Sequence, residues 1–169
     1  MERKKECFPY WDLTNETLGI TYAIPIATMR VKTKGGIVRK KFLVDTGSDL
    51  TTLPKGAREL FSTPLEPLSL QVYGIEGSGM DVFVGRITLV ICGEEVSVRA
   101  HFTETEKIPF ILGRLDVCDK FDLHFLEDRV CFERREDPKK EKDERKEEKK
   151  GEKKDDKEHE KKSHHPKSG

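Results

Sequence analysis

Short apolar and β-branched runs, separated by glycine- and proline-containing breaks, dominate residues 20–133. The runs at 20–31 and 37–44 flank Lys34-Gly35-Gly36, and a glycine pair between two such runs predicts a tight antiparallel hairpin. The second run begins with alternating basic and apolar residues and ends in the continuous Phe42-Leu43-Val44. We therefore expect this strand to pass from a solvated edge into a core.

Strand signals return beyond residue 68, after a stretch that is broken by prolines. Residues 57–61 allow one helical turn, and residues 115–120 predict a short helix after the Ile-Leu-Gly sequence at 111–113. Strands are expected at 68–73, at 80–84 and 87–91 on either side of Gly85, and at 96–102, with a closing hairpin at 121–125 and 129–133. Many short strands and few helices predict an all-β protein built on a closed sheet.

The composition changes at residue 134, beyond which Lys, Arg, Glu and Asp replace almost all apolar side chains. Such a segment cannot bury a core, so residues 134–169 predict a disordered tail of mixed charge. We expect one folded domain at 20–133, preceded by an N-terminal extension at 1–19. The formal net charge of the chain is zero at pH 7, so neither nucleic acid nor a membrane is expected as a required partner.

The cysteines and histidines follow no pattern of metal ligands. Reduced thiols that act as small apolar residues are the expected state of the four cysteines, with a Cys118–Cys131 disulfide as the alternative. His101 and His124 are expected to be ordinary, partly buried histidines, so neither a metal nor another cofactor is predicted. No long apolar run follows Met1, so we expect no signal peptide, no membrane span and a cytoplasmic location.

Asp45 directly follows the apolar end of its strand, and the turn Thr46-Gly47-Ser48 comes next. The strand delivers the carboxylate to the edge of a core, where the amides and hydroxyls of the turn surround it. The same residues also occur in ordinary strand-to-turn connections. A second element, Phe110-Ile111-Leu112-Gly113-Arg114, strengthens the functional interpretation, because a glycine that closes an apolar run lets one strand pass very close to another backbone.

With these motifs the chain resembles the retropepsins, the single-lobed dimeric branch of the aspartic proteases, over residues 20–132. The resemblance is carried by Leu43-Val44-Asp45-Thr46-Gly47-Ser48-Asp49, by Val72-Tyr73-Gly74-Ile75-Glu76-Gly77 with the strand that follows it, and by Ile111-Leu112-Gly113-Arg114-Leu115. It implies a closed barrel that works as a dimer. The first 19 residues and the closing hairpin have no clear counterpart in the retroviral enzymes, so the dimer sheet is expected to be built differently.

The resemblance implies a role for each residue of the turn. Asp45 is one half of a catalytic pair, and Gly47 offers its amide to the carboxylate. Thr46 reaches across the twofold axis to the backbone of the partner. Ser48 donates a hydrogen bond to the outer oxygen of the Asp45 carboxylate.

Two further groups of residues gain roles in the same way. Asp49 and Arg114 match an ion pair within the protomer that braces the dimer interface, the alternative being two unrelated surface charges. Tyr73, Gly74 and Ile75 match a substrate-binding flap, the alternative for Tyr73 being a packed aromatic ring.

Peptide hydrolysis without a metal needs one carboxylate as general base for water and one carboxylic acid to polarise the carbonyl group. Two aspartates about 3 Å apart meet this need, because like charges that close cannot both ionise. The chain has one Asp-Thr-Gly sequence, so only a homodimer completes the pair, with Asp45 from each protomer. The sequence predicts a cofactor-free, homodimeric aspartic endopeptidase; the alternative is a non-catalytic retropepsin-fold module that dimerises and binds peptide.

Overall fold

The computed structural model describes residues 3–61, 64, 66–73 and 79–136, with residues 67–82 described by their backbone alone. The chain divides into two compact units, Met1–Arg134 and Arg135–Gly169, and the described strands all lie in the first. The described elements are β1 (Lys5–Pro9), β2 (Trp11–Asn15), β3 (Ile20–Ile24), β4 (Ile26–Thr33), β5 (Gly36–Val44), β6 (Thr51–Leu53), the 3-10 helix η1 (Lys55–Leu60), β7 (Glu66–Tyr73), β8 (Gly79–Ile91), β9 (Glu94–Thr103), β10 (Phe110–Leu112), β11 (Phe121–Phe125) and β12 (Arg129–Arg134).

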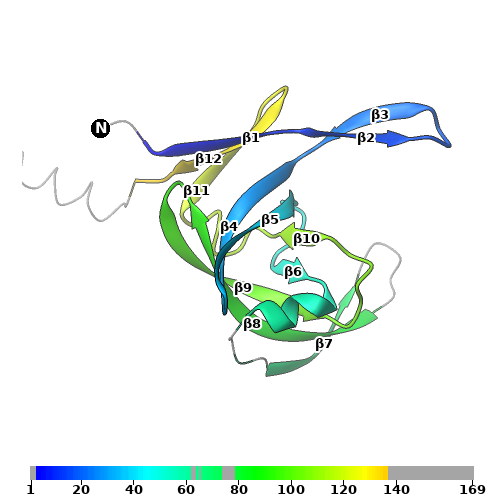
Figure 1. Ribbon diagram of the computed structural model, residues 1–169, viewed down its shortest axis with the longest axis vertical. Coiled ribbons are helices and arrows are strands. Elements are labelled where there is room, and N and C mark those ends of the chain that lie inside the picture. The colour runs from blue at the N-terminus through cyan, green and yellow to red at the C-terminus, as the bar shows by residue number, and fades with distance from the viewer. Residues whose placement is uncertain (1–2, 62–63, 65, 74–78, 137–169) are drawn as a thin grey trace, which may run out of the picture. The chain divides into compact units, whose positions relative to one another are not determined.

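Six strands close into a barrel in the order β4, β5, β10, β6, β9 and β8, and β8 pairs again with β4 (Figure 1). β7 extends the sheet beyond β8. Most neighbouring strands are antiparallel, but β10 runs parallel to β5, and β6 runs parallel to β9. The closed, all-β sheet predicted from the sequence is therefore confirmed.

The predicted hairpin of β4 and β5 turns at Lys34 and Gly35. The run expected as one strand at 20–31 is instead two strands, β3 and β4, which are divided at Pro25. Proline has no amide hydrogen for the ladder of a sheet, which explains the break. Ile26, at the start of β4, pairs with Leu43 near the end of β5. β3, which lies outside the barrel and directly precedes β4, therefore ends next to the end of β5.

β8 continues through Gly85, where the sequence predicted a break between two strands. Gly85 pairs with Ala100 of β9, and both residues are buried. A buried glycine lets a strand bend at a barrel corner without ending it. The following turn lies at Cys92 and Gly93, whose φ angles of 52° and 78° are typical of a type I′ hairpin turn.

β1, β12 and β11 form a separate three-stranded sheet from the two ends of the first unit (Figure 1). Cys7 of β1 lies opposite Cys131 of β12, and the two form a disulfide. The expectation of four reduced thiols is therefore wrong for this pair, and so is the alternative Cys118–Cys131 pairing. The disulfide depends on the register between the two ends of the unit, which local patterns do not contain.

The segment after Gly113 forms hydrogen-bonded turns in place of the predicted short helix. Cys118 N donates to Arg114 O at 2.8 Å, but Asp116 has a φ of 66°, which a right-handed helix does not accommodate. The helical turn expected at 57–61 is present as η1. The helical residues that the structure describes include no segment long and apolar enough to cross a lipid bilayer.

The barrel encloses the core, which the inward-facing side chains of its strands fill. β9 shows the alternation clearly, with buried side chains at Val96, Val98, Ala100 and Phe102. Phe42 and Val44 bring the end of β5 into the same core, and full burial of such a side chain stabilises the fold by about 1.5–3 kcal/mol. Asp45 follows at once, so its position is fixed by the packing of β5.

Candidate active site

The backbone at Asp45 is held by two segments that are distant in the sequence. Val44 N donates to the Pro25 carbonyl oxygen at 2.8 Å, and Asp45 N donates to the Leu112 carbonyl oxygen at 3.1 Å. Pro25 lies at the junction of β3 and β4, and Leu112 ends β10, in parallel register with Val44. The aspartate therefore leaves β5 in a fixed direction.

The turn after Asp45 folds back onto the carboxylate. Gly47 N donates to Asp45 Oδ1 at 2.9 Å, which is the contact that the resemblance implied, and Ser48 N donates to the Asp45 carbonyl oxygen at 3.2 Å. Asp45 is half-buried, whereas Thr46 and Gly47 are exposed. The turn thus orients the carboxylate and leaves it accessible from the surface of the single chain.

The Ser48 hydroxyl makes a different hydrogen bond from the one expected. It donates to the Leu50 carbonyl oxygen at 3.0 Å, whereas the resemblance implied a bond to the carboxylate of Asp45. Serine hydroxyls often satisfy a nearby backbone carbonyl within a turn. In this chain Ser48 stabilises the turn, and the Gly47 amide is the donor to the carboxylate among the residues that the structure describes.

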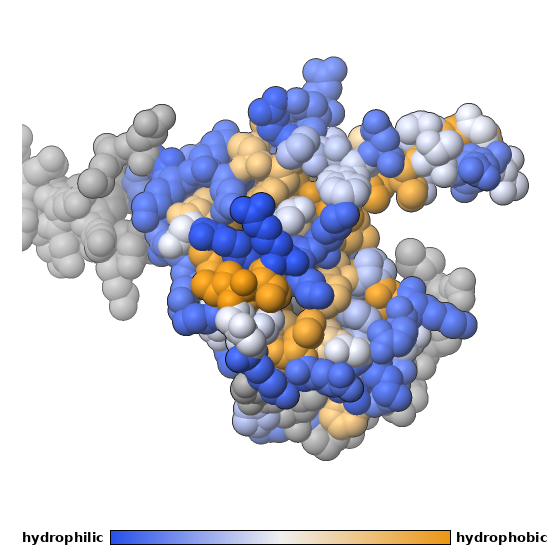
Figure 2. Space-filling view, viewed as in Figure 1, coloured by the Kyte–Doolittle hydropathy of each residue, from blue (hydrophilic) through white to orange (hydrophobic). Residues whose placement is uncertain are grey.

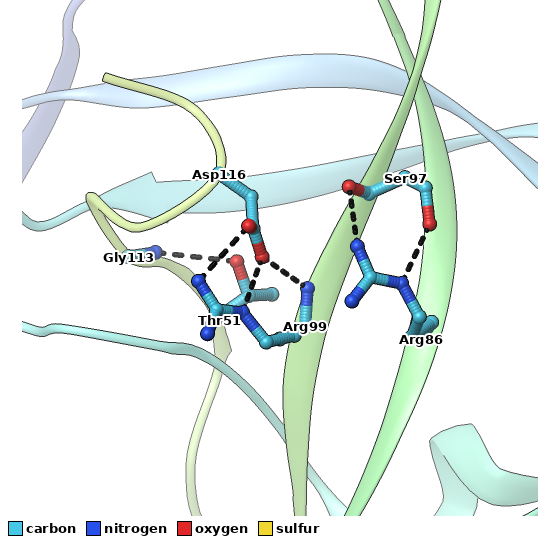
Figure 3. Close-up of polar contacts among 6 residues, drawn as sticks. All are labelled: Thr51, Arg86, Ser97, Arg99, Gly113 and Asp116. Carbon is cyan, nitrogen blue, oxygen red and sulfur yellow. Dashed lines mark hydrogen bonds and ion pairs between the residues drawn. The ribbon is translucent and has the colours of Figure 1, made fainter. Parts of the chain in front are cut away.

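Gly113 lies directly against the backbone of this loop. A Cβ atom added to Gly113 would lie 2.5 Å from the Leu50 carbonyl oxygen and 2.8 Å from the Asp49 carbonyl oxygen. The close approach predicted from the glycine at the end of the apolar run is therefore present. Gly113 N also donates to Thr51 Oγ1 at 3.4 Å (Figure 3). The end of β10 is thereby packed onto the loop that carries the aspartate.

Asp49 and Arg114 form an ion pair within the chain, as the resemblance implied. Arg114 Nε and Nη2 lie 2.8 and 2.6 Å from Asp49 Oδ1. Arg114 N donates to Ser48 O, and Leu115 N to Asp49 O, both at 2.9 Å. The side chains of Arg114 and Asp49 are 57% and 65% exposed, and such an exposed pair contributes about 1 kcal/mol or less. A larger contribution requires that a second molecule cover the pair.

Asp116 and Arg99 form a further clasp that sequence reasoning missed (Figure 3). Asp116 accepts hydrogen bonds from Arg99 N at 2.8 Å and from its Nε and Nη2 at 2.9 and 3.0 Å. These bonds from Arg99 hold the pKa of the Asp116 carboxyl below its ordinary range, against the opposing effect of burial. The clasp ties the turn after Gly113 to β9. The sequence offered only a weak indication of this clasp: aspartate tolerates a left-handed φ, such as that of Asp116 in this turn, better than most residues do.

The predicted flap lies largely outside the described residues. The backbone of Tyr73, at the end of β7, pairs with Gly79 at the start of β8. The Tyr73 side chain, Gly74 and Ile75 are outside the part of the chain that the structure describes. Their contact with substrate stays a prediction, for which the β7–β8 pairing supplies the frame of a hairpin.

His101 and His124 are half-buried in β9 and β11, as expected of ordinary strand histidines. Burial lowers the pKa of His101. His124 Nε2 lies 3.3 Å from Glu133 Oε2 on the neighbouring strand β12. Within the described ranges, no three His, Cys, Asp or Glu side chains are grouped as metal ligands.

No protein-family model matches the chain, and neither does any curated protein. Among solved structures, the chain is similar to EIAV protease complexed with the inhibitor HBY-793, with 18% identity, coverage of 63% of this chain and 93% of that one, and a TM-score of 0.48. It is also similar to a retropepsin-like aspartic protease from Rickettsia conorii, with 18% identity, 79% and 96% coverage, and a TM-score of 0.46. A third is the foamy viral protease-reverse transcriptase in complex with an RNA/DNA hybrid, with 18% identity, 61% and 13% coverage, and a TM-score of 0.41. Since all three TM-scores are below 0.5, the residues of this chain must carry any functional assignment.

Proposed function

We propose that this chain is one protomer of a homodimeric aspartic endopeptidase in which Asp45 supplies half of the catalytic pair. One observation carries the proposal. The half-buried carboxylate of Asp45, at the end of β5, accepts a hydrogen bond from the Gly47 amide at 2.9 Å, in a loop that is packed against Gly113. This arrangement fixes the direction of the carboxylate while keeping it accessible. A second copy and a substrate can therefore both reach it.

In the proposed dimer the two Asp45 carboxylates share one proton, because like charges about 3 Å apart cannot both ionise. The ionised carboxylate takes a proton from water, the water oxygen attacks the peptide carbonyl carbon, and the protonated carboxyl donates its proton to the carbonyl oxygen. The tetrahedral diol then collapses as the carbon–nitrogen bond breaks. The amine nitrogen takes one proton from the pair and a diol hydroxyl returns another, so the singly protonated pair is restored without a cofactor.

The neighbours of Asp45 support this chemistry in different ways. The Gly47 amide orients the carboxylate. Thr46, which is exposed in the single chain, is proposed to reach the partner's backbone across the twofold axis. Asp49 and Arg114, which form an ion pair, are proposed to brace the same loop at the dimer interface. Ser48 belongs to the turn and is given no catalytic role.

The proposed substrate is an extended peptide or a protein segment that adopts an extended conformation. In the proposed dimer, backbone groups at the edges of the β7–β8 hairpin would pair with the peptide as with an added strand, over a cleft formed between the two protomers. Tyr73, Gly74 and Ile75 are proposed to contact this peptide from the flap. Pockets for its side chains would set the cleavage sequence.

A peptide pool incubated with the full-length protein tests this function. The wild-type chain should cleave peptides, and a transition-state mimic of aspartic proteases should inhibit the cleavage. Asp45→Asn should abolish cleavage, because an amide cannot act as general base or share the proton. Asp119→Asn, at an exposed residue, is the matched control and should retain activity. Binding of peptides without cleavage would favour the non-catalytic module, and full activity of Asp45→Asn would refute the catalytic assignment.

A further inference from the structure

The hairpin of β2 and β3, called the arm here, is a two-stranded sheet outside the barrel and projects away from it in Figure 1. Its register places Trp11 opposite Ile24, Leu13 opposite Tyr22, and Asn15 opposite Ile20. Alternate residues of a strand share a face of the sheet. One face of the arm, its apolar face, therefore gathers the large side chains of Trp11, Leu13, Ile20, Tyr22 and Ile24.

This apolar face is open in the single chain. Trp11, Leu13, Ile20 and Tyr22 are 43%, 45%, 50% and 45% exposed. The opposite face is polar, with the hydroxyls of Thr14 and Thr21 hydrogen-bonded at 2.9 Å. A lone two-stranded hairpin is marginally stable in water, and soluble monomers rarely expose adjoining apolar side chains. These two features indicate that another surface covers the apolar face of the arm.

The base of the arm lies beside the catalytic loop. β3 ends at Ile24, and the carbonyl of the next residue, Pro25, accepts Val44 N at 2.8 Å. Lys41 Nζ lies 3.7 Å from the centroid of the Trp11 ring, which ties the base of the arm to β5. A molecule that covers the base of the arm therefore lies next to the end of β5, where Asp45 follows.

Other exposed apolar side chains lie near the base of the arm. Phe125 and Leu126, at the turn between β11 and β12, are 47% and 45% exposed. Tyr10, which precedes β2, donates its amide to the carbonyl of Asp128 in the same turn. Figure 2 shows orange, apolar side chains at the base of the arm and in a smaller area toward its far end, among white and blue residues. The turn between β11 and β12 therefore lies near the residue that precedes β2.

We propose that a second copy of this chain covers the apolar face, so that the hairpin is a dimerisation arm. The inference rests on the proposed function, which needs a second Asp45 beside the first and hence a partner at the base of the arm. β1 and β12 already pair with each other and are joined by the disulfide, so these strands do not separate to interleave with a partner. Among the residues that the structure describes, the arm projects from the barrel and has its base beside the end of β5, which Asp45 follows.

Symmetry makes the arm effective as an interface. In a twofold dimer the same surface acts on both protomers, so each arm packs on the other chain and the contact forms twice. A specific dimer removes about 800 Å² per partner from water. Aromatic residues such as Trp11 and Tyr22 are the side chains that supply large contact areas at such interfaces.

Two double variants of full-length protein test the arm, each replacing one cross-strand pair. Leu13→Thr with Tyr22→Thr alters the apolar face and keeps residues suited to strands. Asp12→Ser with Ala23→Ser alters the adjacent pair on the polar face and is the control. By sedimentation equilibrium, the dimer Kd should rise at least about tenfold for the first variant and stay within about twofold of wild type for the second. Equal Kd values for all three proteins would overturn the proposal.

Hydrogen exchange in the unaltered chain provides a measurement that does not depend on how the variants fold. The amides of β2 and β3 should exchange more slowly at protein concentrations above the dimer Kd than below it. Exchange that is unchanged across this concentration range would contradict the proposal that the arm forms the dimer interface.

Peptide cleavage is measured separately. A chain that dimerises through the arm but cleaves no peptide refutes the proposed function alone. An active chain whose dimer Kd is unchanged by the substitutions at Leu13 and Tyr22 refutes the dimerisation role of the arm alone. A protein that stays monomeric at every concentration refutes both.

Discussion

Gly113 and Leu50 are in direct backbone contact: a Cβ atom on Gly113 would lie 2.5 Å from the Leu50 carbonyl oxygen. The contact joins the end of β10 to the loop that follows Asp45. Because the obstructing atoms belong to the backbone, a side-chain rotation cannot relieve a clash there. The loop that follows Asp45 therefore depends on a glycine at this position.

Gly113→Ala should destabilise the protein and lower any peptidase activity. Forcing extra atoms into a packed site costs about 1–3 kcal/mol, and the displaced backbone carries Asp49 and Leu50. Chemical denaturation measures the loss of stability. Gly35→Ala is the control, since the nearest atom to its added Cβ, Thr33 Oγ1, is 4.0 Å away. If Gly113→Ala is as stable as wild type, the backbone at Asp49 and Leu50 can shift to accommodate the added methyl group without loss of stability.

The Asp49–Arg114 pair should contribute more to the dimer than to the fold of a protomer. Both side chains are exposed in the single chain, so their coupling in protomer unfolding should be about 0.2–1 kcal/mol. If the partner sequesters the pair, Arg114→Ala should weaken the dimer by about 3–5 kcal/mol, because Asp49 is then left buried without its partner.

A double-mutant cycle with Asp49→Ala, measured on the dimer Kd, separates the two cases. The exposed Lys32–Glu95 pair is the control, and its cycle should show no coupling to dimerisation. Zero coupling between Asp49 and Arg114 in the dimer would identify them as ordinary surface ions.

Ser48→Ala should leave the acid limb of the pH dependence of kcat/KM in place. The hydroxyl donates to Leu50 and not to Asp45, so its removal should cost about 1 kcal/mol of turn stability and leave the titration of the catalytic pair unchanged. Rate profiles of the two proteins check this. An acid limb that moves to higher pH would mean that the hydroxyl turns toward the carboxylate in the dimer.

The positions of Asp45 at the end of a strand and of Gly113 against a neighbouring backbone could be predicted from the sequence. Asp45 follows an apolar strand and precedes a turn, and Gly113 closes an apolar run, so short motifs determine both positions. The division of the strand at Pro25 was also visible in principle, since proline lacks the amide that a ladder needs. The alternation of apolar and polar residues located most strands of the barrel, because successive side chains of a strand point to opposite faces of the sheet.

The features that sequence reasoning missed depend on contacts between distant segments. The Cys7–Cys131 disulfide spans 124 residues and requires the register of β1 on β12. Arg99 reaches Asp116 only once β9 lies beside the turn that follows β10. The Ser48 hydroxyl donates to the Leu50 carbonyl oxygen, and the motif alone does not determine which acceptor a serine of such a turn takes.

Asp116→Asn should lower stability at neutral pH and not in acid. Since Arg99 depresses the pKa of Asp116 in the fold, the carboxylate stabilises the native state above its unfolded pKa near 4, and this contribution is lost as the pH falls through the lower, folded pKa. We expect a fall in Tm of about 4 °C at pH 7 that shrinks below pH 4. Asp12→Asn on the polar face of the arm is the control. A Tm difference independent of pH would rule out the charge as its source.

The central claim, that each protomer supplies one Asp45 to a shared catalytic pair, is tested most directly by mixing wild-type and Asp45→Asn chains. The total concentration is kept constant and above the dimer Kd, and the chains are left to exchange before peptide cleavage is measured. If mixed dimers are inactive, activity follows the square of the wild-type fraction, and an equal mixture retains about one quarter of the wild-type rate. A linear dependence, with about one half of the rate retained, would contradict the shared pair, since each protomer would then act alone.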